Sequence, residues 1–506
     1  MANNNANVYD LAVIGAGING AGIARDAAGR GLNVLVVEKD DVSAATSQSS
    51  TKLIHGGLRY LEHYEFRLVR ESLSERETVL RQAPHLAQPL SFVLPHEPHL
   101  RPAWMIRAGL FMYDHLSQRV TLPGSFSADL QASKWGAGLK HSFRKGFVYA
   151  DARVDDARLV LANAMAAREL GADIRMRTKL VGARREGDVW RVTLVAAGGA
   201  TTEVTARAIA NVAGPWVKVV RDTLGASAAT ENVRHVKGSH IVVPRVHRED
   251  HAYILQNKDN RIVFVIPFEE RYSLIGTTDM PVTEFEHPEI SAEEIDYLLQ
   301  LANTYLGKPL SRADVVWTFA GIRPLYDDGQ SDPSAITRDY VLKLDGGGAA
   351  GAPLVSVYGG KITTYRKLAE HALSELQPFL PAMKPAWTRD VLLPGGDLPP
   401  GGLRVWFAEI ERRYPGLPAE ILRGIARRHG SLAPKVLGDA KVAADLGQHF
   451  GNGLTAREVE WFVREEWART TDDVLWRRTK CGLGLSPEGR ARVAACVALS
   501  VAANPA

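Results

Sequence analysis

The sequence has very few cysteines. Cys481 and Cys496 are the only two among 506 residues, and they do not form a Cys-x-x-Cys pair. This spacing argues against an iron–sulfur cluster or a zinc site built from clustered cysteines. Two cysteines are also too few for a disulfide-stapled secreted fold of this length. No calcium-binding loop of the D-x-[DN]-x-[DN]-G type is present either. We therefore expect no bound metal.

Long apolar runs are also missing. The longest, such as residues 263–268 and 493–499, are far shorter than the roughly 20 residues of a membrane-spanning helix. Residues 1–9 contain neither the basic nor the apolar region of a signal peptide. We therefore expect a cytoplasmic protein that contacts a membrane only peripherally.

An excess of one charge is missing as well. The 61 Lys and Arg residues exceed the 57 Asp and Glu residues by only four. This surplus is too weak to predict nucleic-acid binding, but it suits anionic ligands or anionic lipids. A hydrophobic fraction of 45% and a charged fraction of 23% are typical of a soluble globular protein. The length predicts two or three domains.

A glycine-rich turn near the N-terminus predicts a dinucleotide site. Gly15 permits the tight turn, Gly17 lets backbone N–H groups approach a pyrophosphate, and Gly20 lets helix and strand pack closely. Glu38 ends the next apolar run, where a carboxylate can bind a ribose hydroxyl. The whole unit is strand, turn, helix and strand, at residues 10–14, 15–20, 21–29 and 33–37.

The same region favours FAD over other dinucleotides. Glu38, rather than a basic residue, favours a free 2′-hydroxyl and so FAD or NAD instead of NADP. Two further strand-to-glycine turns follow much later, at residues 206–216 and 353–361. A cofactor that is wrapped by several separated segments indicates extended FAD.

Five longer strings carry a family resemblance, and they occur in order over nearly the whole chain. They are Thr46–Leu61, Lys237–Pro244, Gly321–Pro324, Gly359–Arg366 and Leu475–Lys480. Together they resemble the FAD-dependent glycerol-3-phosphate dehydrogenases, most closely the aerobic, respiratory bacterial branch. The resemblance implies the α/β (overall α+β) fold of D-amino-acid-oxidase-like flavoproteins. Such proteins combine a Rossmann-like FAD domain made of discontinuous segments, an antiparallel-sheet substrate domain and, here, a helical C-terminal cap.

The resemblance also predicts how the chain divides. A Pro/Gly-rich linker at residues 393–402 separates the cap from the rest. The tail is a structural cap or a dimerisation element, so a homodimer remains open. The FAD domain is expected at 1–85, 150–235 and 315–390, the substrate domain at 86–149 and 236–314, and the cap at 403–506.

The resemblance implies oxidation of sn-glycerol 3-phosphate to dihydroxyacetone phosphate, with electrons passed to a membrane quinone. A soluble oxidase that uses O₂ is the alternative. The reaction needs a base for the hydroxyl proton, and imidazole has a suitable unperturbed pKa. His55 is the first candidate and His240 the second. Arg323, in a Gly-Ile-Arg-Pro turn, is the predicted phosphate ligand because its fork is bidentate.

Other polar side chains are expected around the substrate and the flavin. Arg59 and Tyr60 are predicted to close on the phosphate or the hydroxyls, and Lys361 to stabilise reduced flavin. Thr363 and Thr364 are flavin donors or a helix N-cap. The resemblance places the following residues at the cofactor: Gly15, Gly17, Ile18, Asn19, Gly20, Glu38, Lys39, Thr46, Ser47, Lys52, Leu53, Leu180, Gly214, Gly360, Lys361, Thr363 and Thr364.

Local patterns add further expectations. Residues 101–119 read as a helix on which Arg107, Asp114 and Gln118 form one narrow polar arc, so it is either buried or lies in a bilayer interface. Residues 190–208 read as a hairpin around Gly198–Gly199. In the tail, Thr455 and Glu458 fit a capping box, and Ser486 fits an N-cap. Residues 277–279 are expected to be a turn cap rather than a site.

Overall fold

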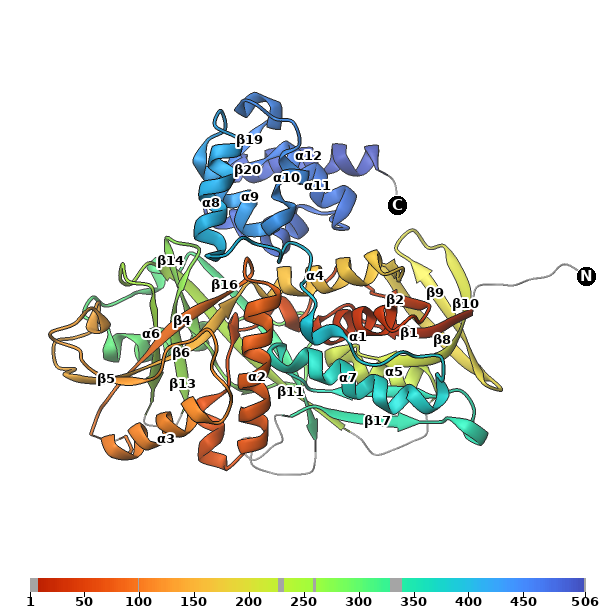
Figure 1. Cartoon of the computed structure of the whole chain (residues 1–506), viewed down its shortest axis with the longest axis horizontal. Coiled ribbons are helices and arrows are strands. Elements are labelled where there is room, and N and C mark those ends of the chain that lie inside the picture. The colour runs from red at the N-terminus through yellow and green to blue at the C-terminus, as the bar shows by residue number, and fades with distance from the viewer. Residues whose placement is uncertain (1–7, 99, 226–231, 258–260, 328–338, 505–506) are drawn as a thin grey trace, which may run out of the picture.

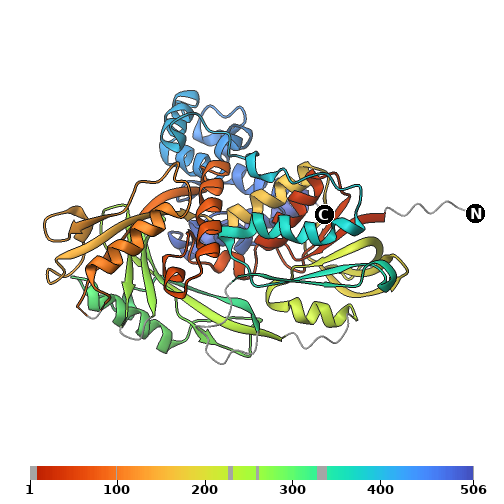
Figure 2. The ribbon, with the colours of Figure 1, turned by 60° about the horizontal axis from the view of Figure 1, so that its bottom comes forward.

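The computed structural model describes residues 8–98, 100–225, 232–257, 261–327 and 339–504. Two β-sheets lie beside each other, and a helical unit rests above them (Figure 1). The view in Figure 2 shows the same two sheets with the helices that cover them. This architecture confirms the predicted fold class.

The first sheet, on the right in Figure 1, has a parallel centre in the order β18-β10-β1-β2-β7. Apolar side chains cover both faces of its central strands, as expected for a parallel sheet with helical crossovers. The predicted hairpin is confirmed, since Trp190 pairs with Ala206. The strands are β1 (Val8–Ile14), β2 (Val34–Val37), β7 (Asp173–Arg175), β8 (Thr178–Glu186), β9 (Val189–Ala196), β10 (Thr201–Asn211), β17 (Val341–Asp345) and β18 (Leu354–Tyr358).

Helices pack on both faces of this sheet. One face buries α1 (Ile18–Gly29), α4 (Asp156–Glu169) and α7 (Tyr365–Leu376). The other face packs against the β8–β9 hairpin and the end of α5 (Val217–Thr223). Because α1 connects β1 to β2, its N-terminus lies at the carboxyl edge of the sheet, where ligands of such folds bind.

The second sheet, on the left in Figure 1, is mainly antiparallel. Its order is β15-β11-β14-β13-β12-β4-β6-β3, with β16 on β11 and β5 on β6. One face buries α6 (Ala292–Tyr305), and the other buries α2 (Phe66–Gln82) and α3 (Ala103–His115). The strands are β3 (Leu53–Ile54), β4 (Ala87–Pro95), β5 (Phe126–Asp129), β6 (Lys145–Val154), β11 (Asn232–Pro244), β12 (His251–Gln256), β13 (Ile262–Phe268), β14 (Tyr272–Gly276), β15 (Met280–Pro281) and β16 (Trp317–Asp327).

Sheet membership differs from the predicted segments at several places. Strand β3 and the first residues of β11 fall within predicted FAD segments but belong to the second sheet. The third FAD segment was expected from residue 315, yet β16 pairs along the length of β11 in the second sheet. The second FAD segment was expected from residue 150, yet β6 continues in the second sheet to Val154. Strand pairing joins residues far apart in the chain, so local pattern did not reveal these boundaries. The remaining division into domains stays a prediction.

The helical unit has its own apolar core, which includes Ile410, Leu422 and Phe462. It joins the body through buried ion pairs, such as Arg158 with Glu466 and Arg478 with Asp41. Its elements are α8 (Gly402–Arg413), α9 (Ala419–His429), α10 (Ala433–Leu437), β19 (His449–Gly451), β20 (Leu454–Thr455), α11 (Ala456–Glu465) and α12 (Pro487–Ala503).

One of the two predicted helix caps in this unit is confirmed. The Ser486 side chain accepts a hydrogen bond from the Gly489 N–H at the start of α12. The capping box of Thr455 and Glu458 is wrong, because the Glu458 carboxylate instead binds Arg428 and His429. Within the described part of the chain, the Thr455 hydroxyl makes no hydrogen bond.

Helix α3 packs one side, with Leu110 and Tyr113, on the second sheet and exposes apolar side chains on the other. It is shorter than predicted, and two members of the predicted polar arc, Arg107 and Asp114, turn inward to bind Ser125. Trp104 is 70% exposed and Phe111 is 59% exposed. The buried-helix alternative is therefore wrong. No helix of the described residues is both long and apolar enough to cross a membrane.

Candidate active site

The glycine turn after β1 is shaped to receive a phosphate. Gly15 has φ +109°, and a Cβ there would lie 2.7 Å from the Val212 carbonyl oxygen. A Cβ on Gly20 would lie 1.9 Å from the Gly15 carbonyl oxygen, so both positions require glycine. At Gly17, the nearest neighbour of a Cβ is the Ser47 Oγ at 3.2 Å, which leaves the turn open on its outer side. The N-terminus of α1 therefore faces space that an anion can fill.

Glu38 fixes this turn from the next strand. Its carboxylate accepts hydrogen bonds from the N–H groups of Ala16 at 2.8 Å and Asp40 at 2.9 Å. Burial raises the pKa of Glu38, and the two N–H donors oppose that rise. Each carboxylate oxygen keeps a free lone pair, so a ribose hydroxyl can still donate to it.

A cavity of about 380 Å³ opens from this turn along the edge of the first sheet. Lys39 and Trp216 stand at its wall, with the Lys39 Nζ 3.8 Å from the centre of the Trp216 ring. Sequence reasoning missed Trp216, although it lies within one of the strand-to-glycine turns. The cavity brings together eight predicted cofactor residues: Gly15, Gly17, Glu38, Lys39, Thr46, Ser47, Leu180 and Gly214.

Two buried polar atoms near the turn after β18 are suited to a polar ligand. The Lys361 Nζ and the Asn19 Oδ1 are buried, and neither bonds any described residue. The Lys361 Nζ lies 3.8 Å from the centre of the Tyr60 ring. A Cβ on Gly360 would meet the Asn19 side chain at 2.7 Å, so this turn also requires glycine. Unpaired buried polar groups are costly, and a polar cofactor satisfies them. These residues therefore fit FAD.

Three predicted cofactor residues have other partners. The Lys52 ammonium is buried against the Asp156 carboxylate at 2.8 Å, and Leu53 lies in the core of the second sheet. The Thr46 hydroxyl lines the cavity but donates to the Ile322 carbonyl at 2.6 Å. Short sequence strings do not distinguish a residue that touches a ligand from one that supports the loop.

One face of the second sheet meets these segments. It carries the two predicted site residues of this sheet, His240 on β11 and Arg323 on β16. Strand register places Phe319, His240, Gly276 and Phe264 in one row across four strands. Arg323 lies on the same face as Phe319, because side chains alternate along β16. The segment after β2 crosses this face at Gly321, where a Cβ would meet the Ser49 side chain at 2.6 Å. The candidate site therefore lies where the two sheets meet.

His240 is enclosed in this row. Its ring stacks on Phe319 with 4.8 Å between centroids, and its Nε2 lies 3.1 Å from the Thr51 hydroxyl. Burial, with Lys52 and Arg323 nearby, lowers the pKa of His240 to about 3. The ring is therefore neutral at physiological pH. Its buried Nδ1 bonds no described residue, so it can accept or donate a proton toward a ligand.

His55 contacts the same row at Phe264. Its ring stands edge-on to Phe264, with 6.4 Å between centroids. Burial lowers the pKa of His55, Asp151 opposes this, and Lys361 and Arg76 add to it. Thr363 holds the His55 backbone, since its Oγ1 accepts from the His55 N–H at 3.3 Å. Thr364 stands at the N-cap of α7, but its side chain caps no described N–H.

Arg323 is held by residues 277–279, which the sequence analysis expected to be a turn cap rather than a site. Its Nη2 donates to the Thr278 carbonyl at 3.0 Å and pairs with the Asp279 carboxylate at 3.2 Å. Residues 277–279 therefore contact a candidate site residue, which the expected turn cap did not indicate. Arg59 forms no ion pair within the described residues, so its charge is open to a ligand.

Comparison with known proteins agrees with this geometry. A family model described as FAD dependent oxidoreductase matches residues 10–366. A second, described as the C-terminal domain of alpha-glycerophosphate oxidase, matches residues 386–503. The chain is 52% identical over 487 residues to the aerobic glycerol-3-phosphate dehydrogenase of Escherichia coli (strain K12), with 96% of each chain covered. It is 48% identical over 485 residues to the D-erythritol 1-phosphate dehydrogenase of Brucella abortus (strain 2308), with 95% of this chain and 96% of that relative covered.

A solved structure is also similar over nearly the full length. The glycerol-3-phosphate dehydrogenase from Bacillus halodurans, complexed with FAD, has a TM-score of 0.74 and 26% identity. The alignment covers 98% of this chain and 95% of that one. The chain therefore belongs to the family of FAD-dependent oxidoreductases, and FAD is its cofactor.

Proposed function

We propose that this enzyme oxidises sn-glycerol 3-phosphate to dihydroxyacetone phosphate and passes the electrons to a membrane quinone. The observation that carries the proposal is that both candidate bases contact one row of side chains, each with a cation near it. His240 stacks on Phe319 with Arg323 nearby, and His55 lies edge-on to Phe264 with Lys361 nearby. The proposed site thus combines two cations with two imidazoles. This is the complement that a phosphorylated secondary alcohol requires.

The cations of this space are suited to the substrate phosphate. Arg323 offers a planar fork for bidentate binding, and Thr278 and Asp279 fix its position. Arg59 and Tyr60, in the turn that follows His55, close on the phosphate or on the remaining hydroxyl. Lys361 lies against Tyr60, and its charge is expected to stabilise the reduced flavin.

The proposed base is His55, which removes the proton from the C2 hydroxyl. Bound FAD supplies flavin N5 as the acceptor of the C2 hydride. The Asp151 carboxylate raises the pKa of His55, whereas the charged neighbours of His240 only lower its pKa. An imidazole that is better able to hold a proton is the better base. His240 instead orients the substrate through its unbonded Nδ1.

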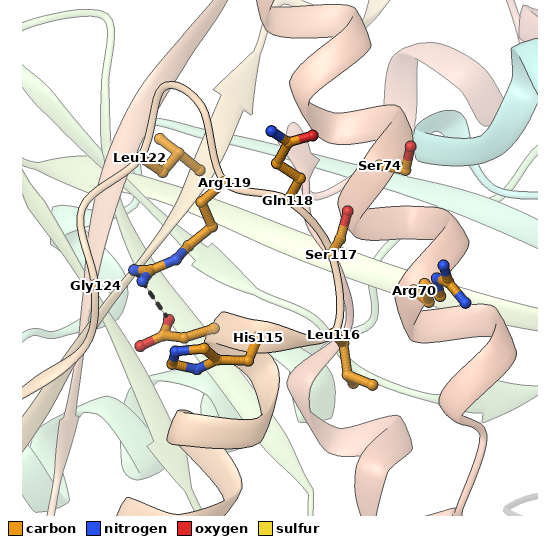
Figure 3. A pocket seen from close by; sticks show the side chains of 10 residues that line it. Arg70, Ser74, His115, Leu116, Ser117, Gln118, Arg119, Leu122 and Gly124 are labelled. Atoms are coloured by element: carbon orange, nitrogen blue, oxygen red, sulfur yellow. Dashed lines mark ion pairs between the residues drawn. The ribbon is translucent and has the colours of Figure 1, made fainter.

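We infer that α3 lies on the inner face of the cytoplasmic membrane. Its exposed side chains, Trp104 and Phe111, suit the interface of a bilayer. Beside the C-terminal end of α3 lies an open cavity of about 750 Å³ (Figure 3). Figure 3 shows Arg70 and Arg119 at this cavity, and Arg119 reaches to 3.8 Å from Asp114. Cations beside an apolar face suit anionic headgroups.

A double variant tests this contact. Trp104→Ser with Phe111→Ser is expected to release the enzyme from anionic liposomes, while turnover with a soluble dye persists. Val442→Ser with Leu499→Ser is the matched control, because both side chains are exposed outside α3. Equal binding by both double variants would show that α3 is not the membrane face.

The substrate has one specific competitor, since a relative at 48% identity is named for D-erythritol 1-phosphate. Steady-state kcat/KM for the two phosphates, each with a quinone analogue and with O₂, tests both substrate and acceptor. We expect glycerol 3-phosphate with the quinone to be preferred. Preference for D-erythritol 1-phosphate would change the substrate, and preference for O₂ would make the enzyme an oxidase.

A further inference from the structure

The Gly56–Gly57 turn, which directly follows His55, is hydrogen-bonded to a cluster of buried polar side chains. The Gly56 N–H donates to the Tyr113 hydroxyl at 2.9 Å and to the Asp151 carboxylate at 3.3 Å. The Tyr113 hydroxyl donates to both oxygens of that carboxylate, at 2.9 and 2.8 Å. Arg76 pairs with the same carboxylate. All three side chains are buried, so water does not compete for these bonds.

The cluster unites three separate elements at one point. Tyr113 comes from α3, Arg76 from α2 and Asp151 from β6. The contact with the turn is close, since a Cβ on Gly56 would lie 2.6 Å from the Tyr113 hydroxyl. Gly57 follows with φ +75°, so the backbone beside His55 is tightly bent. A displacement of Tyr113 would therefore be transmitted directly to the turn.

We propose that Tyr113 is a positioning residue, which fixes the Gly56–Gly57 turn through Asp151 and thereby sets the place of His55. Helix α3 thus has two sides with different tasks. Its exposed side carries Trp104 and Phe111, and its buried side reaches the backbone of the base. The proposal rests on the assignment of His55 as the base.

The same cluster also sets the charge that faces His55. The groups that act on the imidazole are Asp151, which favours its protonation, and Lys361 and Arg76, which oppose it. Burial raises the pKa of Tyr113 well above its usual range, so its hydroxyl stays protonated as a donor. Without that donor, the Asp151 carboxylate acts more strongly on the imidazole, and the pKa of His55 rises.

Tyr113→Phe in the FAD-loaded enzyme tests the proposal, because it removes one hydroxyl and keeps the ring. We expect unchanged FAD content and a rate of flavin reduction lower by roughly 10–10²-fold, the typical effect of a small misplacement. KM should change little, and the acidic limb of the pH–rate profile should move to higher pH. Tyr305→Phe is the matched control, since its buried hydroxyl binds the Gln256 carbonyl away from the site.

Two outcomes separate the claims. A Tyr113→Phe enzyme with the same reduction rate and pH profile as Tyr305→Phe would overturn the positioning role. If His55→Ala left the rate of flavin reduction unchanged, His55 would not be the base, and the proposal for Tyr113 would fail with it. Tyr113→Phe with a displaced acidic limb and a slower step, alongside a collapsed His55→Ala, would support both.

Discussion

Replacing Arg323 with alanine removes the cation that we assign to the substrate phosphate. In the structure, Arg323 lies on the face of the second sheet that carries His240, and Thr278 and Asp279 hold its guanidinium. The phosphate of the bound substrate is a desolvated dianion. Loss of one partner from such a charge typically costs about 3–5 kcal/mol.

The structure favours the lower end of that range. The Arg323 side chain is 34% exposed, so water can partly replace it in the variant. A loss of about 3 kcal/mol corresponds to a roughly 10²-fold lower kcat/KM for glycerol 3-phosphate. Lysine at this position should restore little, because a point charge does not reproduce the bidentate fork.

The assay compares glycerol 3-phosphate with glycerol, which lacks the phosphate. Glycerol should be a poor substrate of the unmodified enzyme and should be hardly affected by Arg323→Ala. Arg312→Ala is the matched control, because Arg312 forms an exposed ion pair with Asp296 outside the site. Equal losses on both substrates would refute the reasoning and give Arg323 a role in the fold or at the flavin.

Three further predictions follow from the site and the buried histidines. Gly17→Val should purify folded but colourless, because a Cβ at this position has only the Ser47 Oγ near it and the valine methyls would extend into the pyrophosphate space; full flavin absorbance would contradict this. His55→Ala should slow flavin reduction by roughly 10²–10⁴-fold in stopped flow with unchanged FAD content, whereas a collapse only in His240→Ala would move the base. His240 and His251 have folded-state pKa values of about 3, below the usual 6.5, so protonation favours the unfolded chain. The stabilisation from the neutral rings is complete above pH 6.5 and is lost as pH falls. Near pH 5, each histidine should lower the free energy of unfolding by up to about 2 kcal/mol. A free energy of unfolding, measured by urea titration, that does not change with pH would contradict this.

Local sequence pattern predicted the elements whose signals are local. A pattern of a few residues predicts the strand–turn–helix unit at Gly15–Gly20, and another predicts the hairpin at Gly198–Gly199. No local pattern predicts which sheet contains β16, because its partner β11 lies far away in the chain. The capping box failed for a similar reason, since Arg428 and His429 compete for Glu458 from another helix.

The sequence supplied candidate residues for the site through its motifs, but it did not supply the residues that support them. Thr51, Thr278 and Tyr113 act through hydrogen bonds between separate elements, and no spacing in the sequence indicates such bonds. The orientation of α3 was also undecided, because a helical wheel shows which residues share a face but not which face the protein covers. In the structure, Arg107 and Asp114 of the polar arc bind Ser125, and this contact shows that the arc faces the protein.

The central claim is that glycerol 3-phosphate reduces the FAD bound to this chain. Anaerobic mixing of the FAD-loaded enzyme with glycerol 3-phosphate tests it directly, with flavin absorbance and dihydroxyacetone phosphate measured together. We expect the flavin to bleach with one dihydroxyacetone phosphate formed for each flavin reduced. A flavin that stays oxidised with glycerol 3-phosphate, yet bleaches with dithionite, would contradict the account.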